Sequence, residues 1–327
     1  MTGTKARIFV NQPAAEPAAG EYAVSVVLPC YNEATTIAEV VGAFRRALPE
    51  AAVYVYDNNS TDNTALLARD AGAVVRRETM RGKGHVVRRM FADVEADVYV
   101  IADGDGTYPS NYARAMIDAL VADNLDMVVG ARSQDDRAYP RGHRLGNRVF
   151  NRAVALLFGR GFTDIFSGYR VLSRRFVKSF PALATGFEIE TELSVHALEL
   201  NMPTAELVVP YGARAAGSSS KLSTVRDGLR IAWTVVLLLK EVRPLGFFSV
   251  IAGALAVLAL GLAYPLLPTW METGLVPRFP TAILATGIVL LAFLSLTCGF
   301  VLDSVARGRR EAKRMHYLAI PGVSTRP

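Results

Sequence analysis

This chain of 327 residues has few cysteines and a small net charge, and each of these features excludes a class of protein. Two cysteines are too few for a disulfide scaffold or a cysteine-rich metal module. The 36 basic residues exceed the 30 acidic ones by only six, which is too mild an excess to indicate nucleic-acid binding. Hydrophobic residues make up 51% and the mean hydropathy is +0.25, which excludes a disordered chain.

The hydrophobic residues gather after residue 230, in two long uncharged runs. Residues 244–271 form a run of 28 and residues 279–302 a run of 24. A helix of about 20 apolar residues crosses a bilayer core of roughly 30 Å, so we expect a two-helix transmembrane hairpin over residues 244–303. The alternative, a pair of buried core helices, fits less well because two such runs follow back to back.

The charges around these runs predict an orientation. The second run is followed by Arg307, Arg309, Arg310, Lys313 and Arg314 against one acid, Glu311, and the positive-inside rule places such a segment in the cytoplasm. We therefore expect residues 304–327 to be a basic cytoplasmic tail and the N-terminal domain to share that side. Residues 1–20 have no apolar segment typical of a cleaved signal, and residues 1–21, rich in Ala and Pro, predict a mobile arm. The expected location is the cytoplasmic (inner) membrane, with multiple passes.

Residues 222–243 carry charges at both ends and an apolar centre with Trp233. This pattern is typical of an amphipathic helix lying in the headgroup region. An ordinary surface helix of the N-terminal domain is the alternative.

Residues 22–221 alternate between short apolar runs and helical patterns, which favours an α/β fold with a mostly parallel, doubly wound, Rossmann-like sheet. Strands are predicted at residues 24–28, 52–56, 74–75, 97–102 and 126–129. Helices are predicted at residues 33–48, from about 62, at 84–94, after Pro109 and at 188–200.

A polar cluster follows each of the five predicted strands, where such sheets bind ligands. The clusters are residues 29–33, 57–62, 81–85, 103–109 and 130–132. Asp103 and Asp105 are separated by one residue, and their carboxylates repel each other unless a cation lies between them. Hard oxygen ligands at this spacing suit Mg²⁺ or Mn²⁺ completed by substrate phosphates; a plain Asp-Gly turn is the alternative.

Three of these segments, PCYNE (29–33), DNNSTDNT (57–64) and DGDGTYP (103–109), resemble in order and spacing those of family 2 inverting glycosyltransferases with the GT-A fold. The segments GAR (130–132), FSGYR (166–170), GFEIE (186–190) and RAAGSSSK (214–221) resemble the branch of dolichol-phosphate mannose synthases and polyprenyl-phosphate glycosyltransferases. Including the hairpin, the resemblance covers about residues 22–305 and does not identify the sugar.

The resemblance implies a site for a nucleotide-diphosphate sugar, with Mg²⁺ or Mn²⁺ held by Asp103 and Asp105. Thr107 stands where the mannose synthases usually have Gln, a further candidate ligand. The implied nucleotide-sugar-binding residues are Pro29, Tyr31, Glu33, Asp57, Lys83, Asp103, Gly104 and Asp105.

The acceptor implied by the resemblance is a polyprenyl phosphate. Its phosphate has a second pKa of about 6, so it is already a nucleophile and needs cations rather than a general base. The cations assigned to it are Arg132, Arg214 and Lys221, with Ser220 as a hydrogen-bond donor; a nonspecific juxtamembrane anchor is the alternative for residues 214–221. Asp103, Asp105 and Arg132 are the predicted catalytic groups, and Glu188 or Glu190 would contact the sugar.

The expected reaction is therefore inverting transfer of a hexose or N-acetylhexosamine to polyprenyl phosphate (undecaprenyl or similar) at the cytoplasmic leaflet, for cell-envelope glycans. A UDP-sugar is favoured over a GDP-sugar. One alternative is a family 2 enzyme with a hydroxyl acceptor, although only Arg230–Trp233 stands where such enzymes have a Gln-x-x-Arg-Trp motif. A sugar-nucleotide sensor is another alternative, and a homo-oligomer formed through the N-terminal arm is a further hypothesis.

Overall fold

The computed structural model describes residues 22–133, 151–152, 154–155, 158, 161–186, 188–212, 233 and 236–323. They fall into two compact units, which are described separately. The first contains the described residues up to Gly212 together with residues 313–323, and the second contains the described residues from Trp233 to Ala312.

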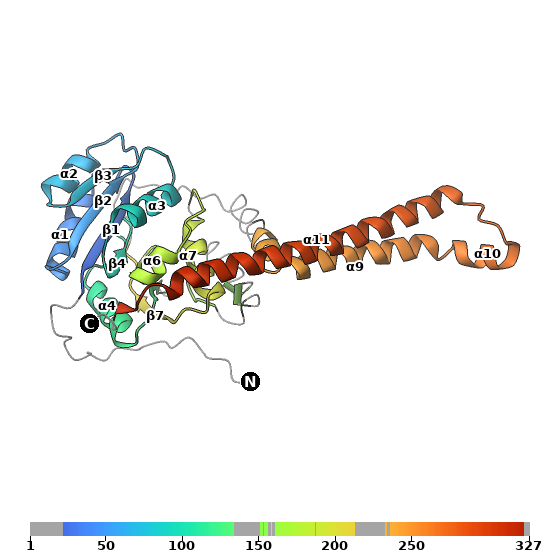
Figure 1. Cartoon of the computed structure of the whole chain (residues 1–327). Helices are drawn as coiled ribbons and strands as arrows, with labels where there is room; N and C mark the ends of the chain where they lie inside the picture. Colours follow the sequence, from blue (N-terminus) through green and yellow to red (C-terminus); the bar gives the residue numbers. More distant parts are fainter. Residues whose placement is uncertain are drawn as a thin grey trace. The chain divides into compact units, whose positions relative to one another are not determined.

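The first unit is built on a seven-stranded sheet with the order β3-β2-β1-β4-β6-β5-β7 (Figure 1). Neighbouring strands are parallel except that β6 runs antiparallel to both β4 and β5. The strands are β1 (Val24–Cys30), β2 (Ala52–Asp57), β3 (Val74–Arg77), β4 (Val98–Ile101), β5 (Met127–Arg132), β6 (Arg170–Ser173) and β7 (Thr204–Val209).

Helices cover both faces of this sheet, which explains why β1 and β4 are buried almost throughout and read as continuous apolar runs. One face packs on α1 (Ile37–Ala47), α2 (Thr64–Asp70) and α4 (Tyr112–Ala122) in the main hydrophobic cluster. On the other face Phe91 of α3 (Lys83–Asp93) meets Tyr99 of β4, with ring centroids 6.2 Å apart. This layer also contains α6 (Arg174–Ser179) and α7 (Ile189–Glu199).

The prediction of a mostly parallel α/β sheet is confirmed, and all five predicted strands are present. The sequence did not reveal β6, which enters between β4 and β5, nor β7 on the edge. Strands β1, β2, β4 and β5 all point the same way, because β4 and β5 are both antiparallel to β6. The segments after these four strands therefore meet at one edge of the sheet.

The second unit contains α9 (Pro244–Ala263), α10 (Leu266–Thr273) and most of α11 (Phe279–Leu318). Two helical stretches, Pro244–Thr273 and Phe279–Leu318, are long and apolar enough to cross a membrane. A Cβ added at Gly299 would lie 3.0 Å from Cβ of Phe248, so α9 and α11 come into close contact there. The predicted arm (residues 1–21) and most of the predicted interfacial helix (residues 222–243) lie outside the described residues.

Candidate active site

Asn58, directly after β2, joins that strand to the loop that begins α3. Its side-chain amide donates to the carbonyls of Glu78 (3.0 Å) and Met80 (2.7 Å) and accepts from the amide of Gly82 (2.8 Å). Gly82 has φ of +126°, and a Cβ there would lie 2.1 Å from the carbonyl of Thr185, so only glycine fits this turn. The result is that Lys83, the first residue of α3, is aimed at the sheet edge.

Carboxylates from three separate segments converge on the buried thiol of Cys30. Burial raises the pKa of this thiol well above its usual value, and the charges of Glu33, Asp103, Asp57 and Asp105 raise it further. These four acids follow β1, β2 and β4, so the sheet edge gathers the segments that the sequence marked as candidate ligand-binding loops.

Lys83 bridges two carboxylates at this edge. Its ammonium lies 2.5 Å from Oδ1 of Asp103 and 2.6 Å from Oε1 of Glu190. Burial alone would lower the pKa of Lys83, but the charges of Asp103 and Glu190 outweigh it, so the pKa is raised. Lys83 is therefore a fixed positive charge beside Asp103.

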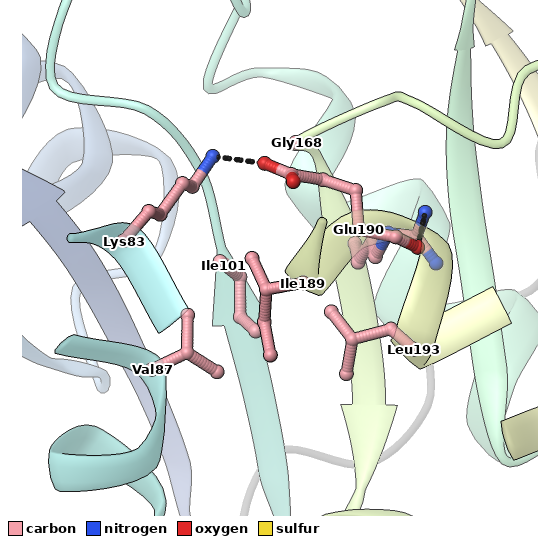
Figure 2. A pocket seen from close by; sticks show the side chains of 8 residues that line it. Lys83, Val87, Ile101, Gly168, Ile189, Glu190 and Leu193 are labelled. Carbon is pink, nitrogen blue, oxygen red and sulfur yellow. Dashed lines mark hydrogen bonds and ion pairs between the residues drawn. The ribbon is translucent and has the colours of Figure 1, made fainter. Parts of the chain in front are cut away.

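Beneath this bridge lies a small cavity with room for water of about 10 Å³. In Figure 2, Lys83 and Glu190 meet above it, and apolar side chains project toward the space below. The apolar residues lining it are Val87, Ile101, Ile189 and Leu193. This apolar lining limits water beneath the ion pairs and strengthens them.

Asp105 is held by Thr107. The Thr107 hydroxyl donates to Oδ1 of Asp105 at 2.6 Å and its backbone amide donates to the same oxygen at 3.1 Å. Both residues are buried. Between the two aspartates, a Cβ at Gly104 would lie 2.5 Å from Sγ of Cys30, so glycine allows this loop to approach β1. Thr107 thus orients the Asp105 carboxylate from within the chain.

The loop before β6 closes against Asp103. A Cβ at Gly168 would lie 2.6 Å from Oδ2 of Asp103, and the Gly168 amide donates to the Tyr108 hydroxyl at 3.0 Å. Arg170 is fully buried and donates to the carbonyls of Ser167, Ile165 and Glu190, and burial lowers its pKa to about 10. This arginine therefore ties the loop to the first turn of α7.

Arg132, at the end of β5, is held by Asp164 in a two-pronged ion pair. Nε lies 2.6 Å from Oδ2 and Nη2 lies 2.8 Å from Oδ1, the geometry in which an arginine fork matches a carboxylate. Glu206 of β7 accepts from the amides of Thr163 (2.8 Å) and Asp164 (3.3 Å). The guanidinium also lies 5.3 Å from the ring centroid of Tyr211, so its position is fixed from two sides.

The structure brings most of the residues singled out from the sequence to this edge. Asp103, Lys83 and Glu190 are in direct contact, and Glu188 lies directly before α7. Pro29 lies in β1 and pairs in register with Tyr56, and Tyr31 follows that strand. Arg214, Ser220 and Lys221, proposed for the acceptor, lie outside the described residues.

Four residues at the site were not assigned from the sequence. Asn58 and Asp164 lie within or beside quoted motifs, and that proximity was the available signal. Glu206 had a clearer signal, because it is the one charged residue in the mostly apolar strand TAELVV. Gly168 belongs to a quoted motif, but its contact with Asp103 depends on the antiparallel strand β6 that the sequence did not reveal.

The donor atoms at this edge suit a hard divalent cation. Asp103 and Asp105 offer carboxylate oxygens, which Mg²⁺ and Mn²⁺ prefer. Within the part of the chain that the structure describes, no group of three or more His, Cys, Asp or Glu side chains is arranged around a common metal position. Two carboxylates therefore fit a cation whose remaining ligands come from a bound phosphate and water.

Comparison with known proteins agrees with this geometry. Residues 25–180 match the model of glycosyl transferase family 2. Glycosyltransferase AglJ of Haloferax volcanii is 36% identical over 292 residues, covering 88% of this chain and 95% of AglJ. A dolichyl-phosphate hexose transferase of the same organism is 30% identical and covers 67% of this chain and 95% of its own.

Among solved structures, glucosyl-3-phosphoglycerate synthase from Mycobacterium tuberculosis, in complex with Mn²⁺, UDP-glucose and glycerol 3-phosphate, superposes with a TM-score of 0.56. The identity is 22%, and the match covers 72% of this chain and 87% of that one, so it shows a shared fold of the GT-A type. Because AglJ is similar over nearly its whole length, the chain belongs to glycosyl transferase family 2.

Proposed function

We propose that this protein transfers a hexose or N-acetylhexosamine, with inversion, from a nucleotide-diphosphate sugar to polyprenyl phosphate at the cytoplasmic leaflet. The observation that carries the proposal is that Glu33, Asp57, Asp103 and Asp105 lie at or after the ends of the parallel strands β1, β2 and β4, at one end of the sheet, with Lys83 paired to Asp103. The acids at or after the ends of β1 and β2 would accept hydrogen bonds from a base or ribose. The acids after β4 suit a metal-bound diphosphate.

A UDP-sugar is the favoured donor. The M. tuberculosis synthase of the same fold was solved with Mn²⁺ and UDP-glucose, which supports a uridine nucleotide and a divalent metal here. Asp103 and Asp105 would hold that metal, and the metal would neutralise the departing diphosphate. Lys83 would add a positive charge beside it, with Gly82 allowing the backbone to approach.

The acceptor follows from chemistry and from the relatives. A phosphate monoester attacks the anomeric carbon without losing a proton, so the site needs positive charge to gather two anions rather than a base. Arg132 would supply such a charge, and Arg214, Ser220 and Lys221 are proposed to join it. The relative named dolichyl-phosphate hexose transferase and the two apolar helices support a lipid-linked acceptor in a membrane.

A donor screen tests the proposal directly. The purified full chain in detergent would receive undecaprenyl phosphate, Mn²⁺ and a panel of UDP- and GDP-sugars, with release of nucleotide and the mass of the extracted lipid as readouts. We expect one UDP-sugar to give a lipid of one added hexose or N-acetylhexosamine mass, and loss of product when the metal is chelated.

The other outcomes distinguish the alternatives. Nucleotide release without a sugar on the lipid phosphate would contradict the proposed acceptor and favour a hydroxyl acceptor. If no donor is consumed although a nucleotide-sugar binds, a sensor role gains support. Transfer from GDP-sugars alone would overturn the choice of nucleotide.

A further inference from the structure

Helix α11 is much longer than its apolar part requires. Its 40 residues correspond to about 60 Å, twice the roughly 30 Å of a bilayer core. The uncharged run ends at Leu302, and the helix continues without a break through residues 303–318, a further length of about 24 Å. The sequence indicated a basic tail here, and the structure shows a continuous rod whose last residues belong to the first unit.

Tyr317, in the last turn of this helix, is hydrogen-bonded to a buried acid of the first unit, which carries the candidate active site. Its hydroxyl donates to Oδ2 of Asp126 at 2.8 Å, and Asp126 is 0% exposed. The other oxygen, Oδ1, accepts from the Ser173 hydroxyl at 2.7 Å and from Nε of Arg175. The Arg175 guanidinium lies 5.0 Å from the Tyr317 ring centroid, so each of Tyr317, Arg175 and Asp126 contacts the other two.

Two further contacts extend this attachment along the chain. Nζ of Lys313, one turn earlier, lies 2.8 Å from Oε2 of Glu199 at the end of α7. After the helix, Gly322 is buried, and a Cβ there would lie 2.7 Å from Oδ1 of Asn124. Val323 packs on the main hydrophobic cluster. We refer to Asp126, Arg175, Glu199, Lys313 and Tyr317 together as the C-terminal clasp.

The clasp lies at the opposite edge of the sheet from the candidate active site. Asp126 immediately precedes β5, whose other end carries Arg132. Among the described residues, the hydrogen bonds and ion pairs of the five side chains of the clasp involve groups other than Lys83, Asp103 and Glu190. A role for it in turnover would therefore be one of positioning rather than of contact with substrate.

We propose that the C-terminal clasp is a positioning device, which ties the catalytic unit to the last membrane helix so that the site can reach a phosphate anchored in the bilayer. The proposal rests on the proposed function, because the position of the first unit affects turnover only if the acceptor is held in a membrane. Helix α11 continues from the apolar run into the first unit, and Tyr317 and Lys313 attach its end there. An untethered unit would still bind a soluble donor but would meet the lipid phosphate less often.

The test compares Lys313→Ala combined with Tyr317→Phe against Arg309→Ala in the full-length protein. Arg309 is exposed on the same helix, and each of these variants loses one positive charge and one trypsin site, so effects on lipid attraction and on cleavage sites are matched. Initial rates would be measured with undecaprenyl phosphate in vesicles and with the short, soluble geranyl phosphate in detergent. Trypsin cleavage of residues 303–318 gives a readout that needs no activity.

We expect the rate of the double variant in vesicles to fall about fivefold or more, while its rate with geranyl phosphate stays within about twofold of wild type. Trypsin should cleave its residues 303–318 about fivefold faster. Arg309→Ala should match wild type in all three assays. An unchanged vesicle rate, or equal losses with both acceptors, would overturn the positioning role. If wild-type protein uses neither acceptor, the proposed function fails, and an unchanged cleavage rate would then overturn the clasp by itself.

Discussion

Gly168→Ala is expected to impair turnover while leaving the fold almost intact. The new methyl group would lie 2.6 Å from Oδ2 and 3.1 Å from Cγ of Asp103. These atoms are the end of a side chain, so the carboxylate can retreat, and the backbone of Gly168 has no positive φ that would strain an alanine. The side chain that must move is the one that the proposed function assigns to the metal.

The size of the effect follows from this distance. Ordinary contact begins near 3.4 Å, so the carboxylate must withdraw by about 0.8 Å, and a misplacement of that order costs about 10- to 100-fold in rate. Such a loss corresponds to about 1.4–2.7 kcal/mol of transition-state stabilisation. A strained Asp103 side chain costs the fold only about 1 kcal/mol, so the melting temperature should fall by a few degrees at most.

The assay would measure kcat/KM against Mn²⁺ concentration together with thermal unfolding. Gly212→Ala is the matched control, because a Cβ there would meet the carbonyl of Thr107 at an ordinary 3.5 Å. The expected result is a lower kcat/KM and a higher Mn²⁺ requirement for Gly168→Ala alone. Wild-type kinetics for Gly168→Ala would refute the reasoning, and so would a collapse of stability, since the clash would then not be absorbed by Asp103.

Three further predictions concern other parts of the first unit. Asp105→Ala should lower kcat/KM by about 100-fold or more and abolish metal-dependent nucleotide binding, measured by calorimetry. Asp164→Asn should raise the KM for lipid phosphate about tenfold with the donor KM unchanged, because it loosens Arg132. Burial and the nearby Lys313 charge lower the pKa of His196 to about 3. Stability should therefore fall as pH drops below 6.5, by up to about 2 kcal/mol at pH 5, and less in His196→Gln, as measured by thermal unfolding.

The strands and helices of the parallel part of the sheet could be predicted because their signals are local. β1 and β2 are short apolar runs, and the following loops carry the polar residues that such folds place there. β6 was missed because its first residue is Arg170, a charged side chain whose burial depends on carbonyls of the preceding loop (Ile165 and Ser167) and of Glu190. The continuation of α11 was missed because charged residues end a membrane span without ending a helix.

For the candidate site, too, the sequence predicts some features and not others. The positions of Asp57, Asp103 and Asp105 at strand ends follow from the alternation of strands and helices. The partners of Lys83 and Arg132 do not, since Glu190 lies 107 positions and Asp164 lies 32 positions along the chain. Such pairs depend on the order of strands in the sheet, which no local pattern encodes.

The charges at the site favour a cation in addition to Lys83 for the proposed reaction. Asp103 and Glu190 share the ammonium of Lys83, and Asp57 at the end of β2 and Asp105 after β4 lie at the same end of the sheet. A nucleotide diphosphate brings further negative charge, and buried like charges repel strongly unless a counter-ion lies between them. Lys83 is already paired with Asp103 and Glu190, so the proposed function predicts that donor binding depends on a divalent cation held by Asp103 and Asp105. Chelation should therefore abolish donor binding itself and not only turnover, which nucleotide binding measured with and without Mn²⁺ can decide.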